Sequence, residues 1–600
     1  MFDKKTEIAV SISAIFIITF IAFSPSLKNK FVTWDDQAYI AENNSIRQLS
    51  IENVKKIFTS AYVSNYQPLS IFTYALEYHF FKLDPRFYHA TNVLLHLLNC
   101  LLVFWIIMLI SGRTSVSLIT ALLFGLHPLR VESVTWVAER KDVLYAFFFL
   151  CSLVSYLYYV KRQSIKYYYC SLLLFLFSIL SKAMAVTLPI VFFVFDYLLN
   201  RKFNRKLFIE KAPFLLLALI FGIIAFIIQR SDGAAANISC LVLLYQMQIA
   251  FYGLMSYLNK LLLPIDLSAI YPYPARGHLF NVMSLLSVAA ISILGCVIFF
   301  SKRFTKKIVF GSLFSLITIL PVLQIIPVGM FFMADRYSYI PSIGIAYIFS
   351  EGFVWLYSRK YKYESALKLA QNIILLALIS MLTFLTYERT KIWKDDIVLW
   401  NDALKGRPES TSANYYLGKA YNDRGDFEKA AAYLSKALEF RINRPIVPVI
   451  SNAYFELGNS YNGKGDLDKA IYNYGRAIEI KPNNIEAYTN RGVAYEKKGD
   501  LEQAISDHTK AIELSHNNDM AYYNRGNAYL LRGSFDQAIL DYDKAIQINP
   551  SHVGAYNNRA NAYLSKQEYD KAWDDVHKME ALGAKVNPNL LEDLKKASGR

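Results

Sequence analysis

The first 390 residues contain eleven apolar segments separated by short polar connections. Most of them approach the length of about 20 apolar residues that a helix needs to cross a membrane. The segments are residues 8–24, 91–110, 114–127, 143–160, 167–182, 184–199, 213–229, 281–300, 308–328, 340–357 and 368–386. Hydrophobic residues make up 54% of the chain and charged residues only 19%. This composition excludes a soluble or disordered protein and predicts a polytopic helix bundle.

The positions of Lys and Arg predict the orientation of this bundle. They concentrate in alternate connections, with the densest groups at residues 201–211, 302–307 and 359–368. Because such connections face the cytoplasm in membrane proteins, we expect a cytoplasmic N-terminus and a C-terminal region on the opposite side. The apolar run 241–263 would reverse this orientation if it crossed the membrane, so we interpret it as re-entrant or interfacial.

Charge and cysteine content exclude several other functions. The net charge is +16, but the basic clusters lie between apolar segments, which favours membrane orientation over nucleic-acid binding. The five cysteines lie in or beside apolar segments and form no C-x-x-C pair, so neither a disulfide framework nor a zinc site is predicted. No P-loop, G-x-G-x-x-G turn or Ser-His-Asp signature occurs, so nucleotide hydrolysis has no support.

A 34-residue repeat dominates the polar C-terminal part. Gly458, Gly492, Gly526 and Ala560 share this spacing, and two further series of Tyr and Ala keep it. Small residues at fixed positions let two helices approach closely, so the pattern resembles the tetratricopeptide repeat. The expected organisation is all-α: a membrane domain at 1–390, a linker at 391–410, repeats at 411–444, 451–484, 485–518, 519–552 and 553–586, and a tail at 587–600.

Stacked repeats of this kind form an α-solenoid with a concave face. The polar residues that we place on that face are Asn490, Arg491, Asn524, Arg525, Asn558 and Arg559. One interpretation makes them solvated helix faces. The other makes them a binding surface on which Asn side chains hold the backbone of an extended polypeptide.

The first outer loop, roughly residues 25–90, contains adjacent carboxylates at Asp35 and Asp36. A loop of this length is usually functional or disordered, and its aromatic content argues against disorder. A neighbouring like charge and partial desolvation raise a carboxyl pKa and suit a general base. A helix cap or a solvated turn is the alternative interpretation of this pair.

Basic residues occur in the other outer connections. The sequence His127 to Asp142 packs seven ionisable residues between two apolar segments, among them Arg130 and Arg140, and later connections add Lys182 and Arg336. Arg binds phosphate through two parallel hydrogen bonds, so these residues are candidates for an anionic headgroup site. The alternative is an interfacial helix whose charges pair locally.

The order of these motifs resembles a known family. The motifs are Trp34-Asp35-Asp36, the segment from His89 to His96, HPLRVESVTWVAERKD, SKAMAVTLP and DRYSYIPSIG, followed by the repeats. Together they are similar to the transmembrane and tetratricopeptide-repeat O-mannosyltransferases and their bacterial relatives, within the GT-C glycosyltransferases. The resemblance covers essentially the whole chain.

The resemblance implies inverting transfer of a sugar from a polyprenyl-phosphate carrier to a protein hydroxyl, with the membrane lipid and an extracytoplasmic acceptor protein as partners. It places Asp35 as the base and Asp36 as an orienting residue or a ligand of a divalent cation, and no cofactor is assigned with certainty. Arg130, Arg140, Lys182 and Arg336 would hold the leaving phosphate. Eukaryotic members often have Asp-Glu at the acidic pair, so donor sugar and metal requirement stay open.

Two other functions remain as alternatives. A membrane-anchored tetratricopeptide scaffold or assembly factor would need no chemistry at Asp35, and a transporter or polymer ligase would need polar residues at mid-membrane, where few occur. For the enzyme we expect a bacterial inner membrane with periplasmic repeats. In a eukaryote the equivalent location is the endoplasmic reticulum membrane with luminal repeats.

Overall fold

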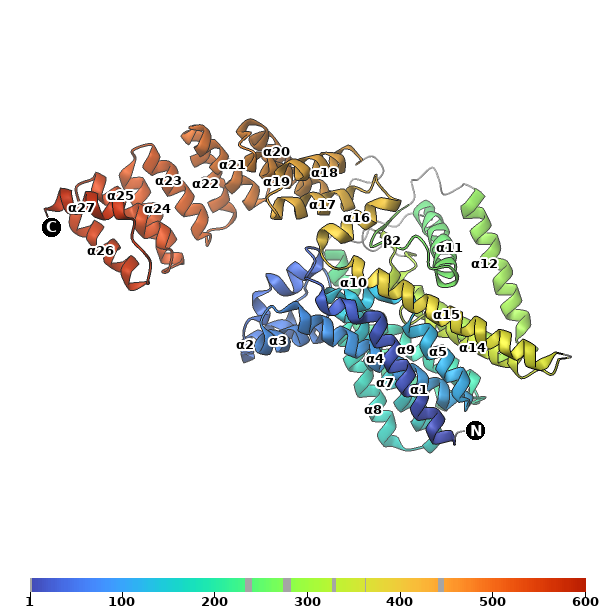
Figure 1. Cartoon of the computed structure of the whole chain (residues 1–600). Coiled ribbons are helices and arrows are strands. Elements are labelled where there is room, and N and C mark those ends of the chain that lie inside the picture. The colour runs from blue at the N-terminus through green and yellow to red at the C-terminus, as the bar shows by residue number, and fades with distance from the viewer. Residues whose placement is uncertain are drawn as a thin grey trace. The chain divides into compact units, whose positions relative to one another are not determined.

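The computed structural model describes residues 3–231, 240–273, 282–325, 331–361, 363–440 and 447–599, to which all structural statements below refer. The chain divides into two compact units, Met1–Arg407 and Pro408–Arg600. Helices make up nearly all regular structure in both units (Figure 1). The predicted all-α class is confirmed.

Each predicted apolar segment coincides with a helix of the first unit, although the segment 308–328 extends beyond the described residues. The eleven helices are α1 (Lys4–Phe23), α4 (Pro85–Ser111), α5 (Thr114–Gly125), α7 (Arg140–Arg162), α8 (Ile165–Ser181), α9 (Leu188–Leu198), α10 (Arg205–Ser231), α12 (Val282–Ser301), α13 (Lys306–Ile319), α14 (Ser342–Tyr357) and α15 (Glu364–Ile392).

The first unit is a membrane-embedded bundle by the length and composition of its helices. Among the described residues, five helices are long and apolar enough to cross a membrane, and six if α5 and the segment that follows it at a 58° bend form one crossing. Others, such as α8 and α14, are apolar but shorter. The chain is therefore an integral membrane protein, while the number of eleven crossings stays a prediction.

Helix α4 organises the core of this bundle. Asp84 caps its start by accepting the N–H of Arg86, Pro85 occupies the first turn, and Gly112 ends the helix at φ 69°. Buried polar groups tie α4 to its neighbours. The ring of His96 contacts the carbonyl of Gly125 at 3.0 Å, and Asn99 donates to the carbonyl of Val143 at 2.9 Å. Helix α4 thereby fixes α5 and α7 in place.

The segment expected as re-entrant or interfacial, 241–263, forms helix α11 (Cys240–Leu262). It packs against a two-stranded antiparallel sheet of β1 (Tyr271–Pro272) and β2 (Phe331–Met333). The hydroxyl of Tyr257 accepts the N–H of Ala334 at 3.0 Å, directly after β2. The helix thus supports the loop before α14, and its depth in a membrane stays a prediction.

The second unit is the predicted solenoid of helical hairpins. Its helices are α17 (Thr411–Asp423), α18 (Phe427–Glu439), α19 (Val447–Gly463), α20 (Leu467–Ile480), α21 (Ile485–Lys498), α22 (Leu501–Leu514), α23 (Asp519–Leu531), α24 (Phe535–Ile548), α25 (Val553–Ser565), α26 (Tyr569–Ala581) and α27 (Pro588–Ser598). Residues 441–444, at the end of the expected first repeat, lie outside the described residues.

The repeated glycines permit close packing within each hairpin. A Cβ added at Gly458 would lie 2.6 Å from the ring of Tyr474, and one at Gly526 would lie 2.7 Å from the ring of Tyr542. These distances are shorter than an ordinary van der Waals contact of a Cβ atom. Glycine is therefore required at the positions of the first helix that the tyrosine ring of the second helix covers. The 34-residue spacing of the glycines therefore has a direct packing cause.

Two segments expected to be irregular form helices. The linker region 391–410 contains α16 (Asp396–Gly406), which belongs to the first unit and buries Trp400. The tail region 587–600 contains α27, which buries Leu590 and Leu594 against the last repeat. In each case apolar residues spaced for one helix face cover a surface that would otherwise meet water.

Candidate active site

Asp36 fixes the conformation of the first outer loop. Its carboxylate accepts the N–H of Val32 at 3.0 Å and the N–H of Ala138 at 2.7 Å, and only 1% of the residue is exposed. The two bonds join the loop to the segment before α7. Burial raises the pKa of Asp36 to about 7, and the two N–H donors oppose this shift. The structure therefore places Asp36 as an internal clamp.

Asp35 has different surroundings from its neighbour. Its side chain is 25% exposed, and its carboxylate lies 3.9 Å from the ammonium of Lys141. Burial raises the pKa of Asp35, Lys141 and Arg336 lower it, and Glu139 adds to the rise. Asp35 thus combines a partly exposed carboxylate with a raised pKa, two properties that suit a general base.

Glu139 is the centre of a charged cluster beside Asp35. Its carboxylate lies 3.0 Å from Lys141, 3.6 Å from Lys182 and 3.3 Å from the Nε of Arg336. The cluster unites Glu139 just before α7, Lys141 in the first turn of α7, Lys182 just after α8 and Arg336 before α14. Of the four predicted phosphate ligands, Lys182 and Arg336 lie in this cluster, where both contact Glu139.

Two more carboxylates complete this Glu139 cluster. Glu132 binds the guanidinium of Arg336 and accepts its backbone N–H at 3.0 Å, and Asp142 binds Lys182 and the hydroxyl of Ser133. Sequence reasoning assigned no individual role to four members of the cluster, Glu132, Glu139, Lys141 and Asp142. The density of ionisable residues between His127 and Asp142 was the available signal.

Arg140 lies inside the protein and not in this cluster. It is 0% exposed, and it binds the carboxylate of Glu77 at 3.1 Å, the carbonyl of Tyr88 at 2.8 Å and the side chain of Asn92. These partners come from α3 (Pro68–Phe81) and α4. The expected phosphate contact of Arg140 is not supported by this position, and Arg140 instead links α3 and α4 to the start of α7.

Arg130 is also completely buried. It donates to the hydroxyl of Ser338 at 2.6 Å, and its guanidinium lies 5.5 Å from the ring centre of Tyr339. Its expected role in binding the donor phosphate is not supported by this position. Arg130 instead holds the short helix η9 (Asp335–Ser338), which carries Arg336, against the bend after α5.

Aromatic rings support the loop that carries Asp35. Trp34 stacks on Trp136 with ring centres 4.3 Å apart, and Trp136 stacks in turn on Trp393 at 5.6 Å. Asp396, at the start of α16, accepts the N–H of Thr33 at 2.8 Å. The segment expected as a linker therefore holds the candidate base in position.

No group of three or more His, Cys, Asp or Glu side chains with a geometry for a metal ion occurs within the described residues. Asp36 was the sequence candidate for a divalent cation. Both of its carboxylate oxygens accept backbone N–H groups. No described residue is therefore assigned as a metal ligand.

The arginines expected on the concave face of the repeats pair with aspartates of their own repeat. Arg491 donates two bonds to Asp507, at 2.7 and 2.8 Å, and Arg525 donates two bonds to Asp541, at 2.8 and 2.7 Å. Arg559 repeats the pairing with Asp575. Their forked donors are therefore occupied within the solenoid, and a bound peptide would have to displace an aspartate to use them.

The asparagines of this set link successive repeats. Asn490 donates to the carbonyl oxygen of the Asn459 side chain at 3.0 Å, and Asn558 donates to that of Asn527 at 2.8 Å. Asn524 is buried. Their role as acceptor-binding residues stays a prediction.

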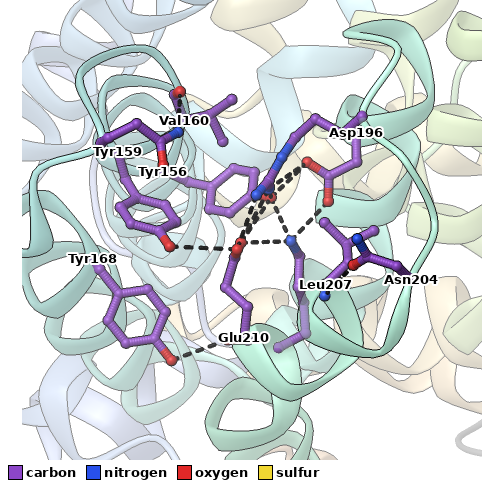
Figure 2. Close-up of polar contacts among 11 residues, drawn as sticks. Tyr156, Tyr159, Val160, Tyr168, Asp196, Asn204, Leu207 and Glu210 are labelled. Atoms are coloured by element: carbon purple, nitrogen blue, oxygen red, sulfur yellow. Dashed lines mark hydrogen bonds and ion pairs between the residues drawn. The ribbon is translucent and has the colours of Figure 1, made fainter.

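A second ionic cluster joins α7, α9 and α10 (Figure 2). Asp196 binds Lys211 at 2.7 Å and accepts from Tyr156 at 2.6 Å, and Arg201 bridges Asp196 and Glu210 at 3.0 and 2.9 Å. Glu351 is likewise paired, with Arg113 and Lys307. The two carboxylates and two cations of this second cluster leave it internally neutral.

The repeat region matches family models described as tetratricopeptide repeat or TPR repeat. The matched residues are 399–445, 458–499, 485–518, 520–552 and 541–574. The predicted repeat type is therefore confirmed.

Several curated relatives cover the chain more widely. "Protein O-mannosyl-transferase F38B6.6" of Caenorhabditis elegans is 25% identical over 62% of this chain and 53% of its own length. "Protein O-mannosyl-transferase TMTC3" of Mus musculus is 25% identical over 62% of this chain and 44% of its own length. The chain thus spans about half the length of these relatives, and its resemblance to them agrees with the motifs of the sequence.

Solved structures match the repeat region. The crystal structure of MamA is 27% identical, with a TM-score of 0.25, over 31% of this chain and 98% of that chain. YrrB, described as a TPR protein with an unusual peptide-binding site, is 21% identical, with a TM-score of 0.28, over 33% of this chain and 97% of that chain.

Proposed function

We propose that this protein is a membrane glycosyltransferase that transfers a sugar from a polyprenyl-phosphate carrier to a hydroxyl group of an acceptor protein on the extracytoplasmic side. The resemblance to proteins named O-mannosyl-transferases supports the reaction class. The observation that carries the proposal is the position of Asp35, a partly exposed carboxylate beside a cluster in which Lys141, Lys182 and Arg336 are held by Glu132, Glu139 and Asp142.

In this reaction Asp35 acts as the general base. The acceptor hydroxyl loses its proton to the Asp35 carboxylate while its oxygen attacks the anomeric carbon of the sugar. The bond from that carbon to the phosphate oxygen breaks on the opposite face, so the configuration is inverted. Asp36 orients the base by clamping the loop through Val32 and Ala138.

Lys182 and Arg336 stabilise the departing polyprenyl phosphate. They are held at fixed positions by Glu139, Glu132 and Asp142, so little reorganisation is needed when negative charge develops on the leaving oxygen. The Asp35 loop and the cations converge from distant parts of the chain. This convergence favours catalysis over a scaffold, which would need no partly exposed carboxylate beside the cluster.

The solenoid would bind the acceptor protein and present its hydroxyl groups to Asp35. The repeat models support a protein-binding role. Because the arginines of the concave face are paired within the solenoid, we expect recognition to rely on amides, apolar groups and the polypeptide backbone.

The test is a transfer assay with the purified full chain, a polyprenyl-phosphate-linked sugar and an acceptor polypeptide. Asp35→Asn should lower the rate by at least about 100-fold, because the base is lost. The unfolding temperature should stay unchanged, because the 3.9 Å contact with Lys141 is weak. Glu52→Gln, an exposed carboxylate of α2 (Ile51–Thr59), is the matched control and should leave the rate unaltered.

Equal rates for the parent protein and Asp35→Asn would refute a catalytic role for this residue. If removal of residues 408–600 abolished the function in cells while Asp35→Asn had no effect, the scaffold function would be the correct one. Asp36→Asn distinguishes the structural role of Asp36 from the catalytic role of Asp35. It should lower the unfolding temperature, because it places an amide N–H against the N–H of Val32.

A further inference from the structure

A crevice in the first unit runs along α15, outside the Asp35 and Glu139 cluster. Its inner compartment, about 150 Å³, is apolar and includes Phe349, Leu378, Met381 and Leu382. Its outer compartment, about 860 Å³, carries charged side chains. Both compartments are lined by Pro264, so one crevice changes from apolar to charged along its length.

One face of α15 forms the wall of both compartments. The lining residues lie three or four positions apart and therefore project from the same side of the helix. They are Leu378, Met381, Leu382, Leu385, Glu388, Arg389 and Ile392. At 1.5 Å per residue this wall is about 21 Å long, which matches an extended acyl chain with part of its headgroup.

Most charges of the outer compartment neutralise one another. Arg389 binds Asp402 at 2.5 Å, and Lys405 lies 3.6 Å from the same carboxylate. Glu388 binds Lys391 at 2.6 Å. Because Arg389 and Lys405 share the single carboxylate of Asp402, these three cations and two carboxylates carry a net charge of +1.

Arg407 and Asp266 are the exceptions. Arg407 donates to the carbonyl of Ile270 at 3.1 Å and lies 4.7 Å from the ring centre of Tyr271. Among the described residues, neither Arg407 nor the exposed carboxylate of Asp266 has a side-chain partner of opposite charge within 4.0 Å. Lys260 lies beside Asp266 and donates to its main-chain carbonyl at 2.9 Å. The compartment thus offers one guanidinium and one carboxylate that take part in no side-chain ion pair.

We propose that this crevice binds a zwitterionic glycerophospholipid. An acyl chain occupies the apolar compartment, the phosphate lies at Arg407, and the ammonium group of the headgroup lies at Asp266. Phosphatidylglycerol would place a neutral glycerol group at Asp266 and form no ion pair there, so phosphatidylethanolamine is favoured over phosphatidylglycerol. This binding site does not depend on the proposed transferase function.

The test offers both lipids in equal amounts to the delipidated full chain in detergent and measures the bound lipid by native mass spectrometry. The parent protein should retain phosphatidylethanolamine in preference to phosphatidylglycerol. Asp266→Asn should remove this preference, a change of about tenfold in relative affinity for one charged contact. Arg407→Gln should weaken the binding of both lipids.

The matched control is Leu376→Ala, on α15 but outside the crevice lining, where 68% of the residue is exposed. It should bind both lipids as the parent protein does. An unchanged lipid preference in Asp266→Asn would overturn the proposal, as would equal loss of binding in the Leu376 control. Since Asp266 is exposed, its substitution tests the site without removing a buried contact.

Discussion

At the residue scale, Asp35 and Asp36 show how adjacent identical side chains take different roles. Asp36 is buried and accepts two backbone N–H groups, whereas Asp35 turns toward Lys141 and retains access from outside. Burial raises the pKa of both carboxyl groups above the usual value of 3.8. A base must be deprotonated, so the transfer rate should fall as the pH is lowered through the raised pKa of Asp35.

His508 is a second residue whose surroundings set its chemistry. It takes the position that Tyr474 and Tyr542 hold in the neighbouring repeats, and its ring packs against Gly492. Tyr474 and Tyr542 donate hydrogen bonds to the side chains of Asn459 and Asn527. In the third repeat the position of these asparagines is occupied by Val493, which offers no acceptor side chain to His508. Both nitrogens of His508 are buried without a hydrogen bond, and burial lowers its pKa to about 4.

This position predicts a pH-dependent stability of the third repeat. Between pH 4 and 6.5 the unfolded state binds more protons at His508 than the folded state does, so stability falls as the pH is lowered. The loss should approach about 3 kcal/mol near pH 4. Hydrogen exchange of the backbone amides of α21 and α22 in the full chain, corrected for the intrinsic exchange rates, measures this loss of stability. His508→Tyr should remove the dependence, and an identical pH profile in both proteins would exclude this origin.

At the element scale, small residues and buried ion pairs fix the helices of the membrane unit. Helices α13 and α14 meet at Gly311 and Gly344, where an added Cβ would lie 2.6 and 2.2 Å from the facing backbone oxygen. In a membrane the hydrophobic effect does not drive helices together, so their association depends on close packing, which small residues permit. The second ionic cluster of Figure 2 fixes α7, α9 and α10 in a comparable way.

Gly344→Ala should push α13 and α14 apart, because the new methyl group meets backbone that cannot rotate away. We expect a loss of about 1–3 kcal/mol, typical of overpacking, visible as a lower unfolding temperature in detergent. Gly352→Ala is the control on the same helix, since no atom lies within 4 Å of its added Cβ. Similar unfolding temperatures for the two variants would contradict the close contact.

Lys211→Met should leave Asp196 buried without its closest cation. Breaking a buried pair by removing one partner costs about 3–5 kcal/mol, so the unfolding temperature should fall strongly. The double variant with Asp196→Asn should lose less than the sum of the single losses, because no unpaired charge remains. Strict additivity would show that the two residues do not interact. Lys302→Met, an exposed lysine, is the control.

The elements were largely predictable from sequence, whereas the partners within the site were not. The 34-residue period identifies the repeats because each hairpin packs on an equivalent neighbour. The pairing of Glu132 with Arg336 joins residues 204 positions apart, and no local pattern encodes it. The burial of Arg140 likewise depends on Glu77 and Asn92 of other helices. Helices α16 and α27 were missed because each is short and lies in a polar region.

At the scale of the whole molecule, the proposed function needs the candidate base and the acceptor-binding repeats in one aqueous compartment. The charge distribution predicts that the first loop and the second unit share the extracytoplasmic side and that the connections rich in Lys and Arg face the cytoplasm. This arrangement would let the solenoid deliver an acceptor hydroxyl to Asp35. A repeat unit on the cytoplasmic side could not do so.

Labelling of single introduced cysteines tests this claim most directly. Exposed sites are Glu52 in the first loop, Glu502 in the repeats and Lys360 in a basic connection. A membrane-impermeant maleimide added to intact cells or sealed vesicles should react with Glu52→Cys and Glu502→Cys from the same side, and with Lys360→Cys only from the other, after subtraction of the native cysteine background. Labelling of positions 52 and 502 from opposite sides would contradict the account.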